Sequence, residues 1–514
     1  MTSASVRAEP AATSAEPTPP APSDEWRPAD NDALDGHHLR SLTEMGSALA
    51  LWSVLYWLMM DRNVADWDNP EPLERFDGRA WRLDNNSLGV NWIAHPLMGG
   101  AAYGFARANH HDPAVAFGYS FLTSFLWEFV LEFKEKVSVN DFIATPGTGI
   151  PVGEFLYKLG LYLDSGAGSS VGLDAARWSL GLPVSIDRAL DGRPPPTVHT
   201  PDNLGLTKQI WHHFGLTAGA LFVESPGVAE YTQARTSLDA LLVTLPGYLD
   251  GRARSGFFHN AEISSFSLGG EASHHGSGLA LAADTLLAGY HAQALAGTEA
   301  SPRGLSATLG VSVAFRYLRS KANRYDAFVA ADALPDPDLS HHVPLLAEQF
   351  AAFHMPGPAV DWHALSEDVA VHLSARAHPD FVGFGAPAFY DWAAANLDEK
   401  GKHILHRQGY FHGWGASGEL AGRLKLGPVR ASADLFYGRY RSQDGLDRHI
   451  ERITVDVPAR GSLLRYGVSV GVRPPLLPLT LAADFAVRRW YSRAGGFERS
   501  ARAAAKGFSA TLEF

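Results

Sequence analysis

The residues best suited to chemistry lie between positions 91 and 154 of a 514-residue chain, in segments otherwise apolar and rich in glycine. A buried polar group costs free energy unless it is paired, so these side chains are expected to hold one another or a ligand. The candidate catalytic residues are His95, Ser124, Glu128, Glu132 and Asp141. The candidate substrate-binding residues are Asn91, Tyr103, Arg107, Thr145 and Glu154.

This set fits acid–base chemistry. His95 would act as the general base, Ser124 as a nucleophile, and Arg107 would hold an anionic group of a lipid or its headgroup. The candidate carboxylates would orient the base or bind a hard divalent metal, and the chain suggests no other cofactor.

The same residues also have a structural interpretation. Ser124, Glu128 and Glu132 follow one another at intervals of four, so they would share one stripe of a helix, which is often its solvated face. Asp141 comes three residues after Ser138, which is the spacing of a capping box. A hydrogen-bonded network that fixes helix packing would use these groups without any reaction. A catalytic site would instead need the histidine within reach of a carboxylate or the serine, and open to a cavity.

Helix start signals divide this region. Prolines at first-turn positions and an Asp-Pro pair predict helices over 96–109, 114–136 and 152–163, with a short helix beginning near Ser138. Antiparallel packing of these helices would bring His95, Glu128, Glu132 and Asp141 into one small volume. Residues 47–60 form an apolar run of about fourteen residues, shorter than the roughly twenty that a spanning helix needs.

The spacing of the polar residues resembles an uncharacterised bacterial envelope family, known only as a domain of unknown function. The pattern is Asn-x3-His-Pro, then Ser-x2-Trp-Glu-x3-Glu, then Ser-x2-Asp, then Thr-Pro-x2-Gly-x4-Glu, within roughly residues 85 to 160. Its positions here are Asn91, His95, Pro96, Gly99, Ala106, Arg107, Ser124, Trp127, Glu128, Glu132, Ser138, Asp141, Thr145, Pro146, Gly149 and Glu154. The resemblance implies a Gram-negative cell envelope and no particular reaction.

Composition narrows the function classes. Hydrophobic residues make up 46% and charged residues 19%, and 50 glycines and 13 tryptophans favour closely packed or lipid-facing β structure. A formal charge of -12 argues against a nucleic-acid partner, which would need a basic face. The absence of cysteine excludes disulfides and thiolate metal sites.

The second part of the chain alternates with a period of two. Apolar residues occupy every second position over 305–317, 429–437, 464–472, 477–487 and 508–514, with small or polar residues between them. This pattern is typical of a transmembrane β-barrel, although a soluble sandwich would alternate too. The terminal Phe514 resembles the insertion signal of bacterial outer-membrane barrels. We expect about twelve strands, with long loops or loop helices over 336–362 and 386–396.

The sequence therefore predicts an α+β membrane protein in three parts: a disordered tail (1–36), a helical unit (37–200) and an antiparallel barrel (201–514). The helices are expected inside the lumen as a plug, or at the periplasmic mouth as a cap. The expected location is the outer membrane of a Gram-negative bacterium, with outer-membrane lipids and the barrel-insertion machinery as partners. A structural or channel role is the first functional hypothesis, and an envelope lipid hydrolase is the alternative.

Overall fold

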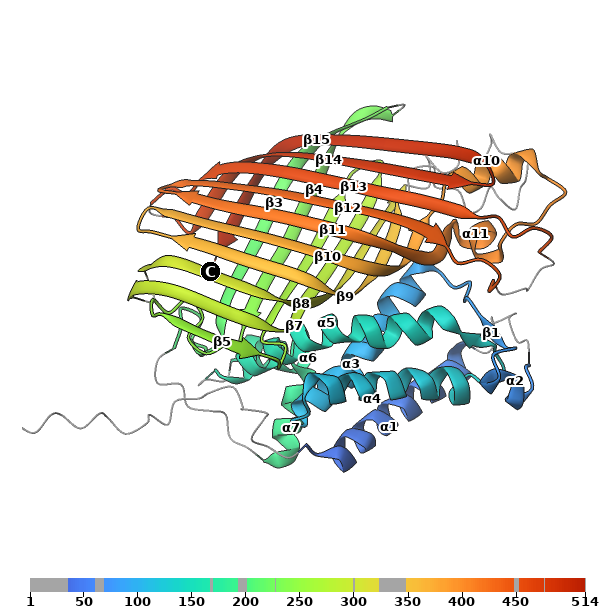
Figure 1. The fold of residues 1–514 in the computed structure, drawn as a ribbon, viewed down its shortest axis with the longest axis horizontal. Helices are drawn as coiled ribbons and strands as arrows, with labels where there is room; N and C mark the ends of the chain where they lie inside the picture. The colour runs from blue at the N-terminus through green and yellow to red at the C-terminus, as the bar shows by residue number, and fades with distance from the viewer. Residues whose placement is uncertain are drawn as a thin grey trace, which may run out of the picture.

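The computed structural model describes residues 36–60, 69–166, 170–192, 201–226, 228–298, 301–322, 348–447, 453–475 and 477–513. The predicted tail, except its last residue, and the terminal Phe514 lie outside this range. Within it, a helical unit precedes a large antiparallel barrel, as Figure 1 shows.

In its described residues, the helical unit consists of helices of very different lengths and three π-helical turns. Its elements are α1 (His38–Leu55), η2 (Tyr56–Met60), α2 (Pro72–Phe76), η3 (Val90–Ala94), α3 (His95–Ala108), α4 (Pro113–Leu126), η4 (Trp127–Leu131), α5 (Val139–Asp164), α6 (Val171–Leu180) and α7 (Leu182–Asp191). Two short strands, β1 (Trp81–Arg82) and β2 (Val137–Ser138), pair in parallel. The helix predicted over 96–109 is confirmed by α3, and the one predicted over 114–136 is divided between α4 and η4.

The prediction of two helices around Asp141 and 152–163 is wrong, because α5 is one helix of 26 residues that contains Pro146 and Pro151. A proline inside a helix costs about 3 kcal/mol. Nearly every residue of α5 from Ala144 to Phe155 is buried. Burial against α3, α4 and the barrel therefore outweighs the local preference of the two prolines.

The barrel is a closed ring of twelve antiparallel strands. The ring contains β3 (Trp211–Ser225), β4 (Val228–Val243), β6 (Ile263–Ala272), β7 (Gly276–Thr298), β8 (Ser301–Ala322), β9 (Gln349–Leu365), β10 (Val369–Gly385), β11 (Tyr410–Leu426), β12 (Val429–Ser442), β13 (Ala459–Val472), β14 (Leu479–Ala494) and β15 (Phe497–Glu513). The ring closes because β15 pairs with β3. The short strand β5 (Arg254–Phe258) lies outside the ring of twelve and pairs with β7 beyond the end of β6. The prediction of about twelve strands is confirmed.

Side chains on the two faces of the wall differ sharply. Large apolar residues are exposed at alternating positions on the outside, including Leu216, Phe222, Leu305, Leu309, Leu373, Leu420, Leu424, Val468, Val470, Leu481, Phe485 and Phe508. The inside carries ion pairs between strands that are not neighbours, such as Arg376 of β10 with Asp284 of β7 (3.0 Å) and Arg235 of β4 with Asp484 of β14 (3.0 Å). An apolar outer surface around a polar lumen is the arrangement of a transmembrane barrel and not of a soluble sandwich.

One predicted loop is a strand. Residues 349–362, expected within a loop over 336–362, belong to β9, whereas 336–347 lie outside the described residues. The first residues of β9 are buried on both faces, so they do not alternate, and a register shift interrupts its pairing with β10 between Arg376 and Asp380. The helical loop predicted over 386–396 is confirmed by α10 (Ala388–Ala395).

The helical unit covers one part of the outer wall of the barrel. Phe155 of α5 stacks on Phe266 of β6, with ring centroids 5.0 Å apart, and Trp92 stacks on Phe381 of β10 at 5.9 Å. The strand neighbours Ser265 and Ser267 face the opposite way and line a cavity inside the barrel. A helical cap is therefore present, but it lies on the outside of the wall, so both expected positions, inside the lumen and at the periplasmic mouth, are wrong (Figure 1).

Candidate functional site

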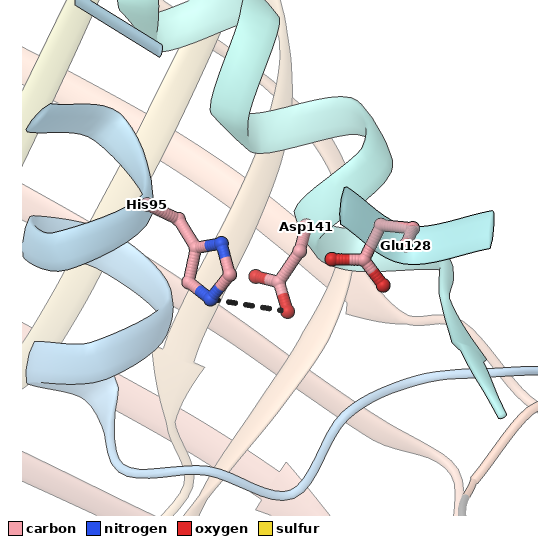
Figure 2. Close-up of side chains that lie close together, drawn as sticks. All are labelled: His95, Glu128 and Asp141. Carbon is pink, nitrogen blue, oxygen red and sulfur yellow. Dashed lines mark ion pairs between the residues drawn. The ribbon is translucent and has the colours of Figure 1, made fainter. Parts of the chain in front are cut away.

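Three side chains from three elements converge within the helical unit. His95 begins α3, Glu128 lies in η4, and Asp141 lies in the first turn of α5. Each offers an imidazole nitrogen or carboxylate oxygen, and these atoms all lie within 4.8 Å of one another (Figure 2). Glu128 and Asp141 are each 1% exposed, and the His95 side chain is 12% exposed. We call these three residues the His–carboxylate cluster.

Close helix packing sets the position of this cluster. A Cβ on Gly99 of α3 would lie 2.0 Å from the backbone oxygen of Thr145 in α5, so only glycine permits this approach. The π-helical turn η4 carries Glu128, which faces the start of α5 as Ser124 of α4 does. Arg75 fastens this turn by donating from Nε to the carbonyl oxygen of Phe129 (3.2 Å) and from its terminal nitrogens to those of Glu128 and Glu135.

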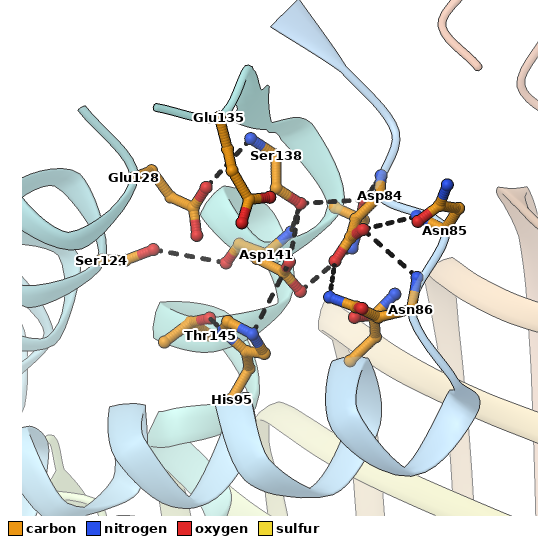
Figure 3. Close-up of polar contacts among 12 residues, drawn as sticks. Asp84, Asn85, Asn86, His95, Ser124, Glu128, Glu135, Ser138, Asp141 and Thr145 are labelled. Atoms are coloured by element: carbon orange, nitrogen blue, oxygen red, sulfur yellow. Dashed lines mark hydrogen bonds and ion pairs between the residues drawn. The ribbon is translucent and has the colours of Figure 1, made fainter. Parts of the chain in front are cut away.

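The carboxylates of the cluster accept several hydrogen bonds (Figure 3). The Ser138 hydroxyl donates to Asp141 Oδ2 (2.6 Å), and Asn140 Nδ2 donates to Asp141 Oδ1 (3.0 Å). The Ser138 backbone N–H donates to Glu128 Oε2 (2.9 Å). Ser138 is also the N-cap of α5, so the predicted capping role of Ser138 is confirmed and coexists with the cluster.

His95 lies beside Asp141 without a direct hydrogen bond. Its Nε2 is 3.7 Å from Asp141 Oδ2, and its Nδ1 is 3.4 Å from the Thr145 hydroxyl. Burial lowers the pKa of His95 to about 4, so the ring is neutral at physiological pH.

Two other candidate catalytic residues lie next to the cluster. The Ser124 hydroxyl donates to the backbone oxygen of Asp141 (3.3 Å). Its hydrogen bond therefore goes to the main chain of α5 and not to the imidazole of His95. Glu132 follows η4, and burial together with the charge of Glu135 raises its pKa well above the usual range. The geometry therefore does not assemble a serine–histidine pair.

Three of the candidate substrate-binding residues form a separate group. Arg107 donates from Nε to Glu154 Oε2 (2.7 Å) and from Nη2 to Glu154 Oε1 (3.2 Å), and the Tyr103 hydroxyl donates to Glu154 Oε2 (2.9 Å). Lys158 lies 3.6 Å from Glu154 and also donates to Ser264 of β6 (3.0 Å). These groups engage one another and the barrel wall, which is the behaviour of a structural anchor.

The remaining candidate, Asn91, contacts two barrel residues that the sequence analysis did not single out. Its Nδ2 donates to the Tyr410 hydroxyl (3.1 Å) and lies 3.5 Å from His412 Nε2. Tyr410 and His412 follow Asn91 by more than three hundred residues, so no local pattern indicates this contact. The long-range contact arises only when the barrel closes beside η3.

A second histidine–carboxylate pair lies on the lumen side of the wall. His354 Nδ1 is 2.6 Å from Asp380 Oδ1 and 3.1 Å from the Ser417 hydroxyl. Both partners meet the same ring nitrogen, so Ser417 is not placed for proton transfer through the far nitrogen of the ring. This trio braces β9, β10 and β11.

Comparison with known families and curated proteins adds one match. The model of a family described as Domain of unknown function (DUF3943) matches residues 80–180, the segment that contains the His–carboxylate cluster. This match agrees with the resemblance to an uncharacterised family seen in the sequence. No curated protein matches the chain.

Solved structures similar to the chain are bacterial barrels. The P. putida toluene transporter TodX is 11% identical over 59% of this chain and 89% of its own, with a TM-score of 0.18. The translocator domain of the autotransporter NalP from Neisseria meningitidis is 9% identical over 59% of this chain and 88% of its own, with a TM-score of 0.19. The transport unit of the autotransporter AIDA-I from Escherichia coli is 10% identical over 62% of this chain and 94% of its own, with a TM-score of 0.18. The fold assigned to this chain rests on its own strand pairing.

Proposed function

We propose that this protein is an outer-membrane barrel with a structural role in a Gram-negative cell envelope, where it holds the helical unit against its outer wall. The supporting observation is that the outer wall has two parts with different surroundings. One part exposes leucine, valine and phenylalanine to the surroundings, and another part, including Val313, Phe315 and Phe381, is buried beneath the helices. Burial of apolar area at about 25 cal/mol per Å² makes both lipid and helices favourable neighbours for such a wall.

The lumen is packed with side chains at one end by a turn between β4 and β5. Tyr248 and Leu249 of this turn pack among inward-facing apolar residues, including Val243 and Ile263. The Tyr248 hydroxyl lies 3.2 Å from His363 Nε2 of β9.

The opposite end is packed by the segment between β10 and β11. There α10 and α11 (His403–Gln408) pack on Phe350, Phe384 and Trp490. With apolar packing at both ends and ion pairs between them, the lumen favours a closed barrel over an open channel.

The site geometry also favours the structural role over the hydrolase. The nucleophile candidate Ser124 bonds to a backbone oxygen, and the carboxylates of Glu128 and Asp141 are held by Ser138. A network held in this way is what helix packing requires, whereas a hydrolase needs a nucleophile in contact with its base.

The proposed partners are outer-membrane lipids along the exposed wall and the machinery that inserts barrels. Full-length protein expressed in a Gram-negative host is expected in the outer-membrane fraction, with a gel mobility that changes on heating. The purified protein is expected to give no steady conductance in a planar bilayer. A stable open pore would contradict the closed lumen. A lipid profile of the envelope that changes when His95 is replaced would favour the hydrolase hypothesis.

A further inference from the structure

We propose that His95, Glu128 and Asp141 bind one divalent transition-metal ion of the zinc class, which ties α3, η4 and α5 together. The three side chains come from separate elements and point toward one small volume, as Figure 2 shows. This binding site is independent of the structural role proposed for the barrel.

The spacing of His95 and Asp141 supports a shared ion. His95 Nε2 and Asp141 Oδ2 are 3.7 Å apart, which is beyond the 2.7–3.2 Å of an N–H···O hydrogen bond. Two ligands about 2.0–2.1 Å from a tetrahedral zinc ion lie about 3.3 Å from each other. The observed separation is thus closer to that of two ligands of one metal than to that of a bonded pair.

The charge of the cluster also favours a cation. Glu128 and Asp141 are each 1% exposed and would place two negative charges in a buried volume. Two like charges held close together in a buried volume are costly. One divalent ion would neutralise both carboxylates and use the lone pair of the imidazole.

The surrounding hydrogen bonds hold the ligands as metal sites require. The Thr145 hydroxyl lies 3.4 Å from His95 Nδ1, which leaves Nε2 directed at Asp141. Ser138 orients both carboxylates, one through its backbone and one through its hydroxyl. Partners of this kind fix the tautomer and orientation of ligands, and their loss commonly lowers metal affinity 10–100-fold.

The ligand types indicate the class of metal. An imidazole nitrogen suits zinc, copper, iron and nickel, whereas calcium and magnesium prefer oxygen ligands alone. Three protein ligands leave a fourth tetrahedral position for water or another small ligand. We therefore expect Zn²⁺ to bind in preference to Ca²⁺ or Mg²⁺.

The test uses the full chain, without an affinity tag, purified in detergent and treated with a chelator. Zn²⁺ affinity is measured by competition with a chromophoric chelator, and Co²⁺ is added separately to report tetrahedral coordination by its visible absorption. The expected result is one high-affinity ion per chain with a tetrahedral cobalt spectrum. The variants His95→Ala, Glu128→Gln and Asp141→Asn are each expected to lose at least 10-fold in affinity.

Asp112→Asn is the matched control, because Asp112 caps α4 away from the cluster and asparagine caps equally well. Gel mobility on heating shows whether each variant keeps a folded barrel. The proposal is overturned if the folded wild-type chain binds no Zn²⁺, or binds Ca²⁺ or Mg²⁺ more tightly. It is also overturned if the three variants bind Zn²⁺ as the wild type does, since other histidines would then hold the ion.

Discussion

Gly147 of α5 lies directly against the ring of Phe353 on β9: a Cβ at Gly147 would be 2.3 Å from Phe353 Cε1. Phe353 faces outward, because its strand neighbours Ala352 and His354 belong to the inner face, where His354 meets Asp380. The helix and the outside of the barrel are therefore in van der Waals contact at this point.

Replacing this glycine should separate the helix from the wall. Gly147→Leu is expected to destabilise the protein by about 1–3 kcal/mol, because overpacking forces the ring or the helix to move. The midpoint of thermal unfolding in detergent measures the effect. Gly118→Leu on α4 is the control, since its Cβ would meet nothing within 4 Å. Equal stability of the two variants would contradict the contact.

The ion pairs in the lumen should contribute more to the free energy of unfolding than those at its rim. Arg376 lies 3.0 Å from Asp284 and 3.1 Å from Asp361, and its side chain is 15% exposed. Arg376→Met leaves two buried carboxylates without their cation, so a loss of about 3 kcal/mol is expected. Arg303→Met removes an exposed pair with Glu367 and should cost about 1 kcal/mol or less. Urea unfolding of both variants compares the costs, and a reversed order would refute this account of the lumen.

The turn between β4 and β5 should open if Gln293 is removed. Gln293 Nε2 donates to the backbone oxygens of Gly247 (3.0 Å) and Arg252 (2.8 Å), and its Oε1 accepts from the N–H of Leu249 (3.0 Å). Gln293→Ala therefore frees the turn, and single-molecule conductance recordings should show openings that the wild type lacks. Gln233→Ala, which removes a buried glutamine of β4, should remain closed. Identical recordings from both variants would mean that the turn does not obstruct the lumen.

Asp447 should make stability depend on pH. Burial raises the pKa of Asp447 to about 7, with Asp444 and Asp456 adding to the rise and Lys402 opposing it. Between about pH 4 and 7 the unfolded chain releases a proton that the folded chain keeps, so the free energy of unfolding falls as pH rises through this window.

Asp447→Asn removes this titration. The unfolding temperature of the wild type is expected to fall more than that of the variant between about pH 4.5 and pH 7.5. Parallel curves for the two proteins would show that the carboxyl group is solvated in the folded state.

Local patterns predict part of this structure well. The alternation of apolar and polar residues predicts β8 and β13, because one face of each strand is the apolar outside of the barrel and the other faces the lumen. Capping residues mark the start of α4 and α5 at Asp112 and Ser138. The convergence of His95, Glu128 and Asp141 is predicted together with Glu132, which lies beside this cluster and not in it.

The remaining features depend on long-range packing. Proline signals divide α5 in the sequence, but the burial of Pro146 and Pro151 between helices and wall keeps one helix. The first residues of β9 lack alternation because both of their faces are covered. The place of the helices on the outer wall follows from contacts such as Asn91 with Tyr410, which no sequence window contains.

The position of α5 on the outside of the barrel can be tested directly by cross-linking. The chain has no cysteine, so within one chain two introduced cysteines can form a disulfide only with each other. A Cβ at Gly147 would lie 2.7 Å from Cδ1 of Phe353, which is two bonds from the Cβ of that residue. This spacing is within reach of a disulfide.

The deciding measurement is therefore disulfide formation in intact outer membranes, read as a shift in gel mobility that a reductant reverses. Gly147→Cys combined with Phe353→Cys is predicted to cross-link, and Gly147→Cys combined with Ala352→Cys is predicted not to. A cross-link to position 352 without one to position 353 would place the helix on the lumen side and contradict the account.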